Sequence, residues 1–189
     1  MIPTLGETLL ALAGLWRFAR EGAPALRWFD RSMTGFWRSF GVAVIVVPLQ
    51  VALVALQVAA PADGIGWVGL ILVETGAYVI QWVALPVILY EVAARLGRLP
   101  QYVDFVIVYN WTGMPYQIIS LVLTLIASLG LVGDTAVLVL ALILNTGMLA
   151  FEWFIARQTL RFSGLACAAL VALDFSIAIV VENAVAQIL

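Results

Sequence analysis

The chain has 189 residues, of which 65% are hydrophobic and only 11% are charged, with a net charge of -2. Soluble domains are about 45–50% apolar and about 25% charged, so the composition excludes a soluble fold and places most of the chain in a lipid bilayer. All nine cationic residues are arginine and histidine is absent, which excludes imidazole proton transfer and imidazole metal ligands.

The first predicted element is an amphipathic helix over residues 4–21. Its apolar residues recur at helical spacing and its charged residues fall opposite them: Leu5, Leu9, Leu12 and Trp16 against Glu7, Arg17, Arg20 and Glu21. This pattern predicts a helix lying in the membrane interface, or one packed on the cytoplasmic ends of the spans, and the two are compatible. Residues 22–33 predict a break and a second short interfacial helix, so residues 1–33 form the expected cytoplasmic segment.

Five long apolar stretches follow, over residues 35–59, 65–93, 102–130, 134–158 and 163–187. Each exceeds the ~20 residues that a helix needs to cross the hydrocarbon. Short polar or Gly/Pro breaks separate them, the first at residues 61–64. The predicted fold class is all-α, an integral membrane bundle of about five transmembrane helices over residues 34–189 that follows the interfacial helices.

The arginines all fall on one side of this five-span arrangement. They precede or open the first span, or lie in the connections after the second and fourth spans (Arg17, Arg20, Arg27, Arg31, Arg38, Arg95, Arg98, Arg157 and Arg161). The opposite connections carry Asp63 and Asp134. The positive-inside rule then predicts a bacterial inner-membrane protein with a cytoplasmic N-terminus and a periplasmic C-terminus.

Asp174 is the polar residue placed deepest in the predicted bilayer, about eleven residues into the fifth span. An ionised group there costs about 2.5–3.5 kcal/mol, and no arginine is expected at that depth. Asp174 is therefore predicted to be protonated, hydrogen-bonded to a polar side chain, or facing water. It is either a proton- or cation-binding carboxylate or a neutral acid that bonds one helix to another.

Other polar residues of the spans are candidates for a polar seam with Asp174. Span two carries Glu74 and Gln81 on one helical face, followed by Pro86. Span three carries a stripe of polar and small residues, with Pro115 expected to interrupt the helix (Asn110, Gly113, Gln117, Ser120, Thr124 and Ser128). With Asn145 of span four, these predict a polar pathway in which Pro86 and Pro115 are hinges. The alternative is close packing of helices through small and polar residues.

The remaining acids of the spans are expected at the cytoplasmic boundary, as a belt of structural ion pairs. Glu91 and Arg95 are spaced i, i+4 and predict a local pair. Asp104 is expected within reach of Arg95 or Arg98, and Glu152 within reach of Arg157 or Arg161. Glu182 and Asn183, near the outer end, are expected to be solvated.

Motifs for catalysis or for cofactors are missing from the sequence. It has no Gly-rich phosphate loop, no HExxH and no paired cysteines, because Cys167 is its single cysteine. No metal site, no cofactor, no enzymatic activity and no nucleic-acid partner are therefore expected.

The start of span three, Tyr109-Asn110-Trp111 leading to Pro115, resembles the aromatic-then-proline pattern of bacterial Yip-domain membrane proteins. Those proteins also have a cytoplasmic N-terminal segment, five spans and a C-terminus on the far side. The long hydrophilic head of the eukaryotic members is missing here. The resemblance implies a non-enzymatic, membrane-organising or partner-binding role and transfers no catalytic residue.

Two functions follow from these observations. The first is a non-enzymatic protein that binds other membrane proteins, itself or membrane lipid, which the small size and the interfacial helices favour. The alternative is a proton-coupled transporter or channel that moves a proton or cation along the polar seam. Since five spans are few for alternating access, this alternative predicts a homo-oligomer. A membrane enzyme that uses the boundary acids Glu91, Asp104 and Glu152 ranks third.

Overall fold

The computed structural model describes residues 2–57 and 66–188, and every regular element within these ranges is helical. This confirms the predicted all-α class. The elements in chain order are α1 (Leu5–Glu21), the short 3-10 helix η1 (Ala23–Trp28), α2 (Met33–Gln57), α3 (Gly66–Arg95), α4 (Leu99–Ser128), α5 (Asp134–Thr159) and α6 (Gly164–Ile188).

Helices α2 to α6 are the five elements of the described chain that are long and apolar enough to cross a membrane. The shortest have 25 residues, which is about 38 Å of helix against a hydrocarbon thickness of ~30 Å. The chain is therefore a multispan membrane protein by its helix composition. The other helix ends agree with the predicted spans to within one turn, whereas the predicted end of the first span at 59, the start of the second at 65 and the break at residues 61–64 lie outside the described residues.

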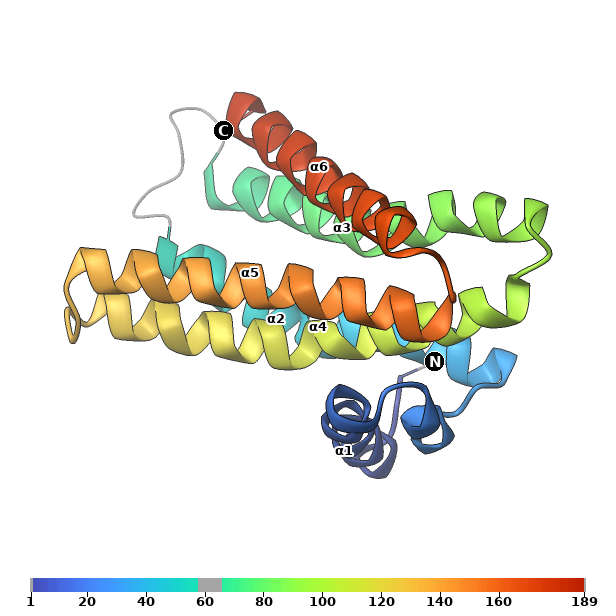
Figure 1. Cartoon of the computed structure of the whole chain (residues 1–189). Helices are drawn as coiled ribbons and strands as arrows, with labels where there is room; N and C mark the ends of the chain where they lie inside the picture. The colour runs from blue at the N-terminus through green and yellow to red at the C-terminus, as the bar shows by residue number, and fades with distance from the viewer. Residues whose placement is uncertain (1, 58–65, 189) are drawn as a thin grey trace.

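The long helices run alternately in opposite directions (Figure 1). Helices α2, α4 and α6 therefore begin at the end of the bundle where α3 and α5 finish. The turns at this end carry Arg95, Arg98, Arg157 and Arg161, and we call it the arginine end. The turn between α4 and α5 lies at the opposite, far end.

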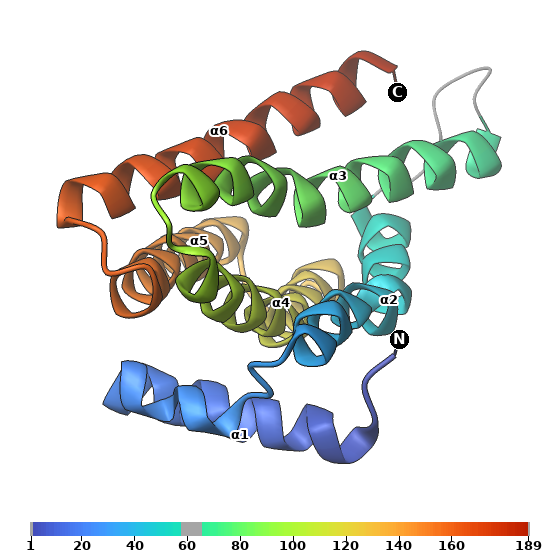
Figure 2. The ribbon, with the colours of Figure 1, turned by 90° about the vertical axis from the view of Figure 1, so that its right-hand side faces the viewer.

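The helices form two groups. Helix α4 packs between α2 and α5, and α3 packs along α6 on one side of these three helices (Figure 1). Helix α1 lies on the other side and runs across the bundle rather than along it (Figure 2). The two groups meet where α3 contacts α4 and α5 contacts α6.

The buried core lies toward the arginine end. Its largest fully buried side chains include Leu85 near the end of α3, Phe105 near the start of α4, and Ile155 near the end of α5. Apolar side chains nearer the far end, such as Leu72 and Leu138, are more than half exposed. Because these residues have little protein around them, hydrocarbon is the environment that suits them.

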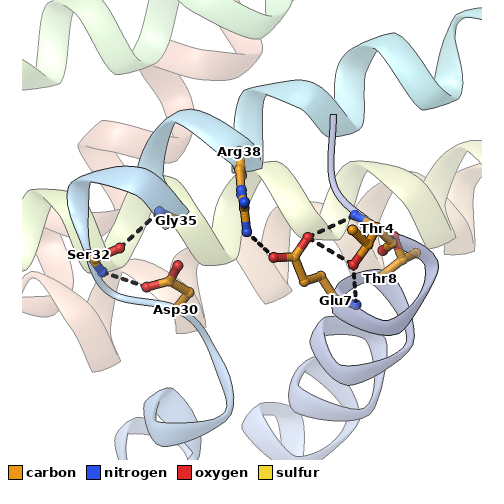
Figure 3. Close-up of polar contacts among 7 residues, drawn as sticks. All are labelled: Thr4, Glu7, Thr8, Asp30, Ser32, Gly35 and Arg38. Carbon is orange, nitrogen blue, oxygen red and sulfur yellow. Dashed lines mark hydrogen bonds and ion pairs between the residues drawn. The ribbon is translucent and has the colours of Figure 1, made fainter. Parts of the chain in front are cut away.

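Helix α1 begins with a capping box, in which each partner satisfies a backbone group of the other. The hydroxyl of Thr4 accepts a hydrogen bond from the Glu7 backbone N–H at 3.3 Å. Oε2 of Glu7 accepts from the Thr4 backbone N–H at 2.8 Å, while its Oε1 accepts from Arg38 of α2 (Figure 3). One carboxylate therefore both starts α1 and ties it to α2.

The chain after α1 is fastened to the end of α5. Gly22 ends the helix with a φ of 68°, a conformation that favours glycine. The next backbone N–H, that of Ala23, donates to Oε1 of Gln158 at 3.1 Å. The break and short helix were predicted over residues 22–33; the short helix is η1, Ala23–Trp28, with Pro24 in its first turn.

Helix α1 is apolar on two sides. Ala11, Gly14, Leu15 and Phe18 are buried against the rest of the protein. The face predicted from helical spacing is a different one: Leu5 is 75% exposed, Leu9 59% and Trp16 63%. Packing therefore uses the neighbouring face, where Gly14 lets Trp28 and Phe29 approach closely.

The proline residues do not interrupt their helices. Pro86 lies inside α3 and Pro115 inside α4, and both helices are continuous. The interruption expected at Pro115 is therefore wrong for the backbone. Transmembrane helices tolerate such prolines because neighbouring groups satisfy the freed carbonyl.

Candidate functional site

A cavity of about 300 Å³ lies between α3, α4, α5 and α6. It brings together four of the six residues of the predicted polar pathway: Gln81, Gln117, Asn145 and Asp174. No arginine lines it among the described residues. The polar groups that reach the cavity are therefore acids, amides and hydroxyls.

Two carboxyl groups meet in this cavity. Glu152 of α5 and Asp174 of α6 both line this cavity. The phenol of Tyr109 on α4 donates to Oδ2 of Asp174 at 3.0 Å. Asp174 is half-buried and Glu152 is 6% exposed. A hydrogen bond between two carboxyl groups requires one proton between them.

Glu152 also retains unused hydrogen-bonding capacity. Its Oε1 is buried and has no hydrogen-bond partner among the described residues. Buried polar atoms are normally paired, because a lost hydrogen bond to water costs about 1–3 kcal/mol. An unpartnered carboxyl oxygen beside a cavity is a position that a bound cation or proton donor can fill.

The predicted pairing of Glu152 with Arg157 or Arg161 is wrong. Arg157 instead donates to the backbone carbonyl of Phe162, and none of the ion pairs among the described residues joins Glu152 to Arg161. Residues five apart on a helix point about 140° away from each other, so Glu152 and Arg157 face different sides of α5. Because Glu152 and Arg157 face different sides of α5, the Glu152 side chain faces the cavity and not the cytoplasmic boundary.

The amides of the predicted pathway have separate partners. Asn145 accepts a hydrogen bond from the Tyr116 phenol at 3.1 Å at the cavity wall. Gln117 lines the cavity and donates to Gln50 of α2. Asn110 is fully buried between α4 and α2, where its amide donates to the Ser39 hydroxyl at 2.9 Å. Asn110 is therefore a packing residue and does not line the cavity.

Glu74 and Glu182, two acids of the outer half, lie elsewhere than the sequence predicts. Glu74 lines a separate small pocket between α2 and α3, together with Gln50 and Trp67. Glu182, expected to be solvated, lines the main cavity. The polar stripe of α4 is also divided, because Gly113 and Gln117 face the cavity while Asn110 faces α2.

Ion pairs gather near the arginine end. Glu91 and Arg95 form the i, i+4 pair that their spacing predicts, at 2.8 Å. Asp104 pairs with Arg31 and not with Arg95 or Arg98; Arg31 donates two bonds of 2.6 and 2.7 Å to its carboxylate. These bonds raise the pKa of Arg31. Arg98 instead donates to the backbone carbonyl of Leu160 at 2.8 Å, which joins two turns.

The sequence reasoning missed several cavity residues, among them Tyr109, Tyr116 and Trp82. Tyr109 and Tyr116 are seven residues apart, two helical turns, which places both on one face of α4. That spacing was visible in the sequence, but aromatic residues in a span are ordinarily assigned to packing. Their hydroxyls bond to Asp174 and Asn145 and so connect α4 to α6 and α5.

The residue types in the cavity limit its chemistry. No group of three or more His, Cys, Asp or Glu side chains is placed to hold a metal ion in residues 2–57 and 66–188. The site offers three carboxyl groups, two phenols and amide oxygens around a hollow, a set suited to holding a proton or a cation.

Comparisons with protein-family models, with curated proteins and with solved structures find no significant match. The likeness to Yip-domain proteins thus rests on Tyr109-Asn110-Trp111, on Pro115 and on the number of spans.

Proposed function

We propose that the protein is a non-enzymatic, proton-coupled carrier of a small organic cation. The observation that supports this most directly is that Glu152 and Asp174 line one cavity, which no arginine lines among the described residues. Because the two carboxyl groups hold one proton when they bond to each other, a cation can enter between them as that proton leaves. Charge is then conserved across the exchange.

The cavity wall favours an organic cation over a metal ion. Trp82 and Phe175 contribute aromatic rings, and such rings attract cations that lie over their faces. The volume of about 300 Å³ is at the lower limit of ordinary ligand pockets. A small ammonium ion meets both conditions. Since five spans are few for alternating access, the proposed working form is a homo-oligomer.

Proton release on cation binding tests this proposal. The purified protein is titrated with tetramethylammonium in weakly buffered detergent solution that contains a pH indicator. We expect release of about one proton per bound cation. Asp174→Asn and Glu152→Gln should abolish the release, while the control Glu91→Gln, at an exposed pair outside the cavity, should leave it unchanged.

Three results would contradict the proposal. They are the absence of binding, binding without proton release, and equal release from the wild-type protein and Asp174→Asn. Release with sodium but not with tetramethylammonium would retain cation exchange and reject the organic substrate. Melting temperatures of the variants, measured in the same detergent, separate loss of binding from loss of folding.

We further propose that the arginine end faces the cytoplasm of a bacterium, with the far end in the periplasm. The support is the positive-inside rule applied to Arg95, Arg98, Arg157 and Arg161. Leu96 and Leu129 are exposed in turns at opposite ends, 56% and 69%. In a Cys167→Ser background, a membrane-impermeant maleimide should label Leu129→Cys in intact spheroplasts and Leu96→Cys only after lysis. The reverse pattern would invert the orientation.

The second candidate is an accessory or membrane-organising protein that binds other membrane proteins. Exposed apolar residues near the arginine end of α2 favour it, with Met33 57% and Trp37 60% exposed. It is also the role that the Yip-domain resemblance implies. Native mass spectrometry after gentle purification distinguishes the two: other polypeptides in fixed ratio support this candidate, and a closed homo-oligomer supports the carrier.

A further inference from the structure

A second hollow lies beneath α1, next to the acidic cavity along α4. It is a groove of about 320 Å³ between α1 and the faces of α4 and α5. Leu12, Leu15, Trp16 and Ala19 of α1 form one wall. The other wall consists mainly of apolar residues of α4 and α5: Pro115, Ile119, Leu144, Met148 and Phe151.

The polar atoms in the groove wall are already paired. The Thr112 hydroxyl donates to the backbone carbonyl of Val108 at 2.8 Å within α4. The Tyr116 phenol donates to Asn145 at 3.1 Å. The groove therefore presents an apolar surface, and the hydroxyls in its wall already have hydrogen-bond partners. An occupant of this groove needs an apolar chain.

The exposed face of α1 continues the groove. Leu5, Leu9 and Trp16 lie on the same helical face as Leu12 and are more than half exposed. Such a stripe on a helix with a charged opposite face is typical of helices that lie in a membrane surface, with the apolar side about 5–10 Å into the lipid. The groove thus opens where acyl chains are present.

A cation lies at the edge of this stripe. The Arg20 guanidinium is 4.4 Å from the centroid of the Trp16 ring, and Trp16 lines the groove. Ion pairs with carboxylates engage Arg17, Arg27, Arg31, Arg38 and Arg95 in the described residues, but not Arg20. Arg20 is therefore available to a phosphate, which a guanidinium binds with paired donors.

The position of α1 along the bundle fits a membrane boundary. It meets α4 at Thr112 to Ile119, about halfway along that helix. From Thr112 to the far end of α4 the helix rises ~24 Å, and α1 itself lies partly within the lipid, so the remaining length suits a hydrocarbon layer of ~30 Å.

From these observations we infer that the groove between α1 and the α4–α5 face is a binding site for an anionic phospholipid. One acyl chain occupies the apolar groove and the phosphate lies at Arg20. The groove and the acidic cavity share Thr112, Tyr116 and Met148 in their walls, but Ala19 and Arg20, the residues that the test changes, do not line the acidic cavity.

The test compares two tryptophan variants by native mass spectrometry. Ala19 lines the groove, whereas Ala13 is exposed on another side of α1 and does not line it. The full-length protein is released from nanodiscs made of equal parts phosphatidylglycerol and phosphatidylcholine. We expect retained phosphatidylglycerol on the wild-type protein and on Ala13→Trp, and its loss from Ala19→Trp, in which the indole fills the groove.

The headgroup is tested separately. Arg20→Gln should lower the preference for phosphatidylglycerol over phosphatidylcholine about fivefold, while the control Arg27→Gln, at an exposed pair with Glu21, should not. Equal lipid retention by Ala19→Trp and Ala13→Trp, or an unchanged preference in Arg20→Gln, would overturn the site. Release of a dimer that Ala19→Trp dissociates would also overturn it and assign the face to a second copy.

Discussion

Arg31, in the connection before α2, binds both carboxylate oxygens of Asp104 on α4, at 2.6 and 2.7 Å. Asp104 is buried, while half of the Arg31 side chain is exposed. This pair joins the N-terminal segment to the central helix of the bundle, and its geometry is the bidentate arrangement that makes arginine–carboxylate bonds strong.

Removal of Arg31 alone should destabilise the protein. Arg31→Ala leaves a buried carboxylate without its partner, and we expect a loss of about 2 kcal/mol, below the roughly 3–5 kcal/mol of fully buried pairs because Arg31 is partly solvated. Reversible unfolding in mixed micelles measures it. The double variant with Asp104→Asn should recover part of the loss, and Arg27→Ala serves as the exposed control. Additive effects of the two substitutions would show that the pair is not coupled.

The buried Ser39–Asn110 bond gives a second stability prediction. The Ser39 hydroxyl accepts from the Asn110 amide at 2.9 Å and donates to the Phe36 carbonyl at 2.7 Å. Ser39→Ala leaves the amide unpaired and should cost about 1–2 kcal/mol. Ser176→Ala is the matched control, because that hydroxyl is exposed and bonds only within its own helix. Equal melting temperatures for the two variants would contradict the prediction.

Gly35 should not tolerate a methyl group. A Cβ at this position would lie 1.9 Å from the backbone carbonyl oxygen of Asp30, which is backbone and cannot rotate away. Gly35→Ala should therefore lower stability by about 2 kcal/mol or more through overpacking. Gly76→Ala in α3 has open space around the new methyl group and should melt at or above the wild-type temperature. Differential scanning fluorimetry in detergent compares the two.

Acid should release α1 from α2. Backbone hydrogen bonding to Thr4 lowers the pKa of Glu7 below 4.5, and hydrogen bonds from Ser32 lower the pKa of Asp30 below 3.8. A carboxylate with a lowered pKa in the folded state adds stability above its unfolded pKa and loses it as pH falls through the folded pKa. The contact between Glu7 of α1 and Arg38 of α2 should therefore hold at neutral pH and weaken below about pH 4.

Spin labels at Gly6→Cys and Thr34→Cys, in a Cys167→Ser background, can follow this contact by pulsed electron paramagnetic resonance. The distance distribution should stay narrow at neutral pH and broaden in acid. Glu7→Gln should broaden it already at neutral pH, since the neutral amide binds Arg38 less strongly. If the distance distribution of the doubly labelled protein with Glu7 intact stays unchanged down to pH 3, the contact is not sensitive to acid.

The helices were predictable from sequence because the hydrocarbon around a membrane span restricts the backbone to few conformations. Backbone groups in hydrocarbon must bond within the segment, so an apolar run of sufficient length forms a helix. The same argument predicted that polar residues such as Asp174, Gln81 and Asn145 would gather, and they line one cavity. Periodicity states which face a residue occupies, and these faces were well defined.

The partners were harder to predict, because periodicity does not say which helix faces which. Asp104 bonds to an arginine 73 residues away, in a connection rather than a span. The buried face of α1 could not be chosen either, since the helix has two apolar sides and composition does not rank them. Glu152 is different: its five-residue separation from Arg157 already argued against a pair on one helix face.

The attachment of Ala23 to Gln158 has a consequence for biosynthesis. These two residues are 135 positions apart, so the N-terminal segment leaves the ribosome long before its anchor is made. Synthesis proceeds at roughly 5–20 residues per second. For several seconds, therefore, α1 exists before Gln158 has been made. The Ala23–Gln158 bond can therefore form only after α5 has been made, and during that interval the membrane surface is the natural support for the apolar face of α1.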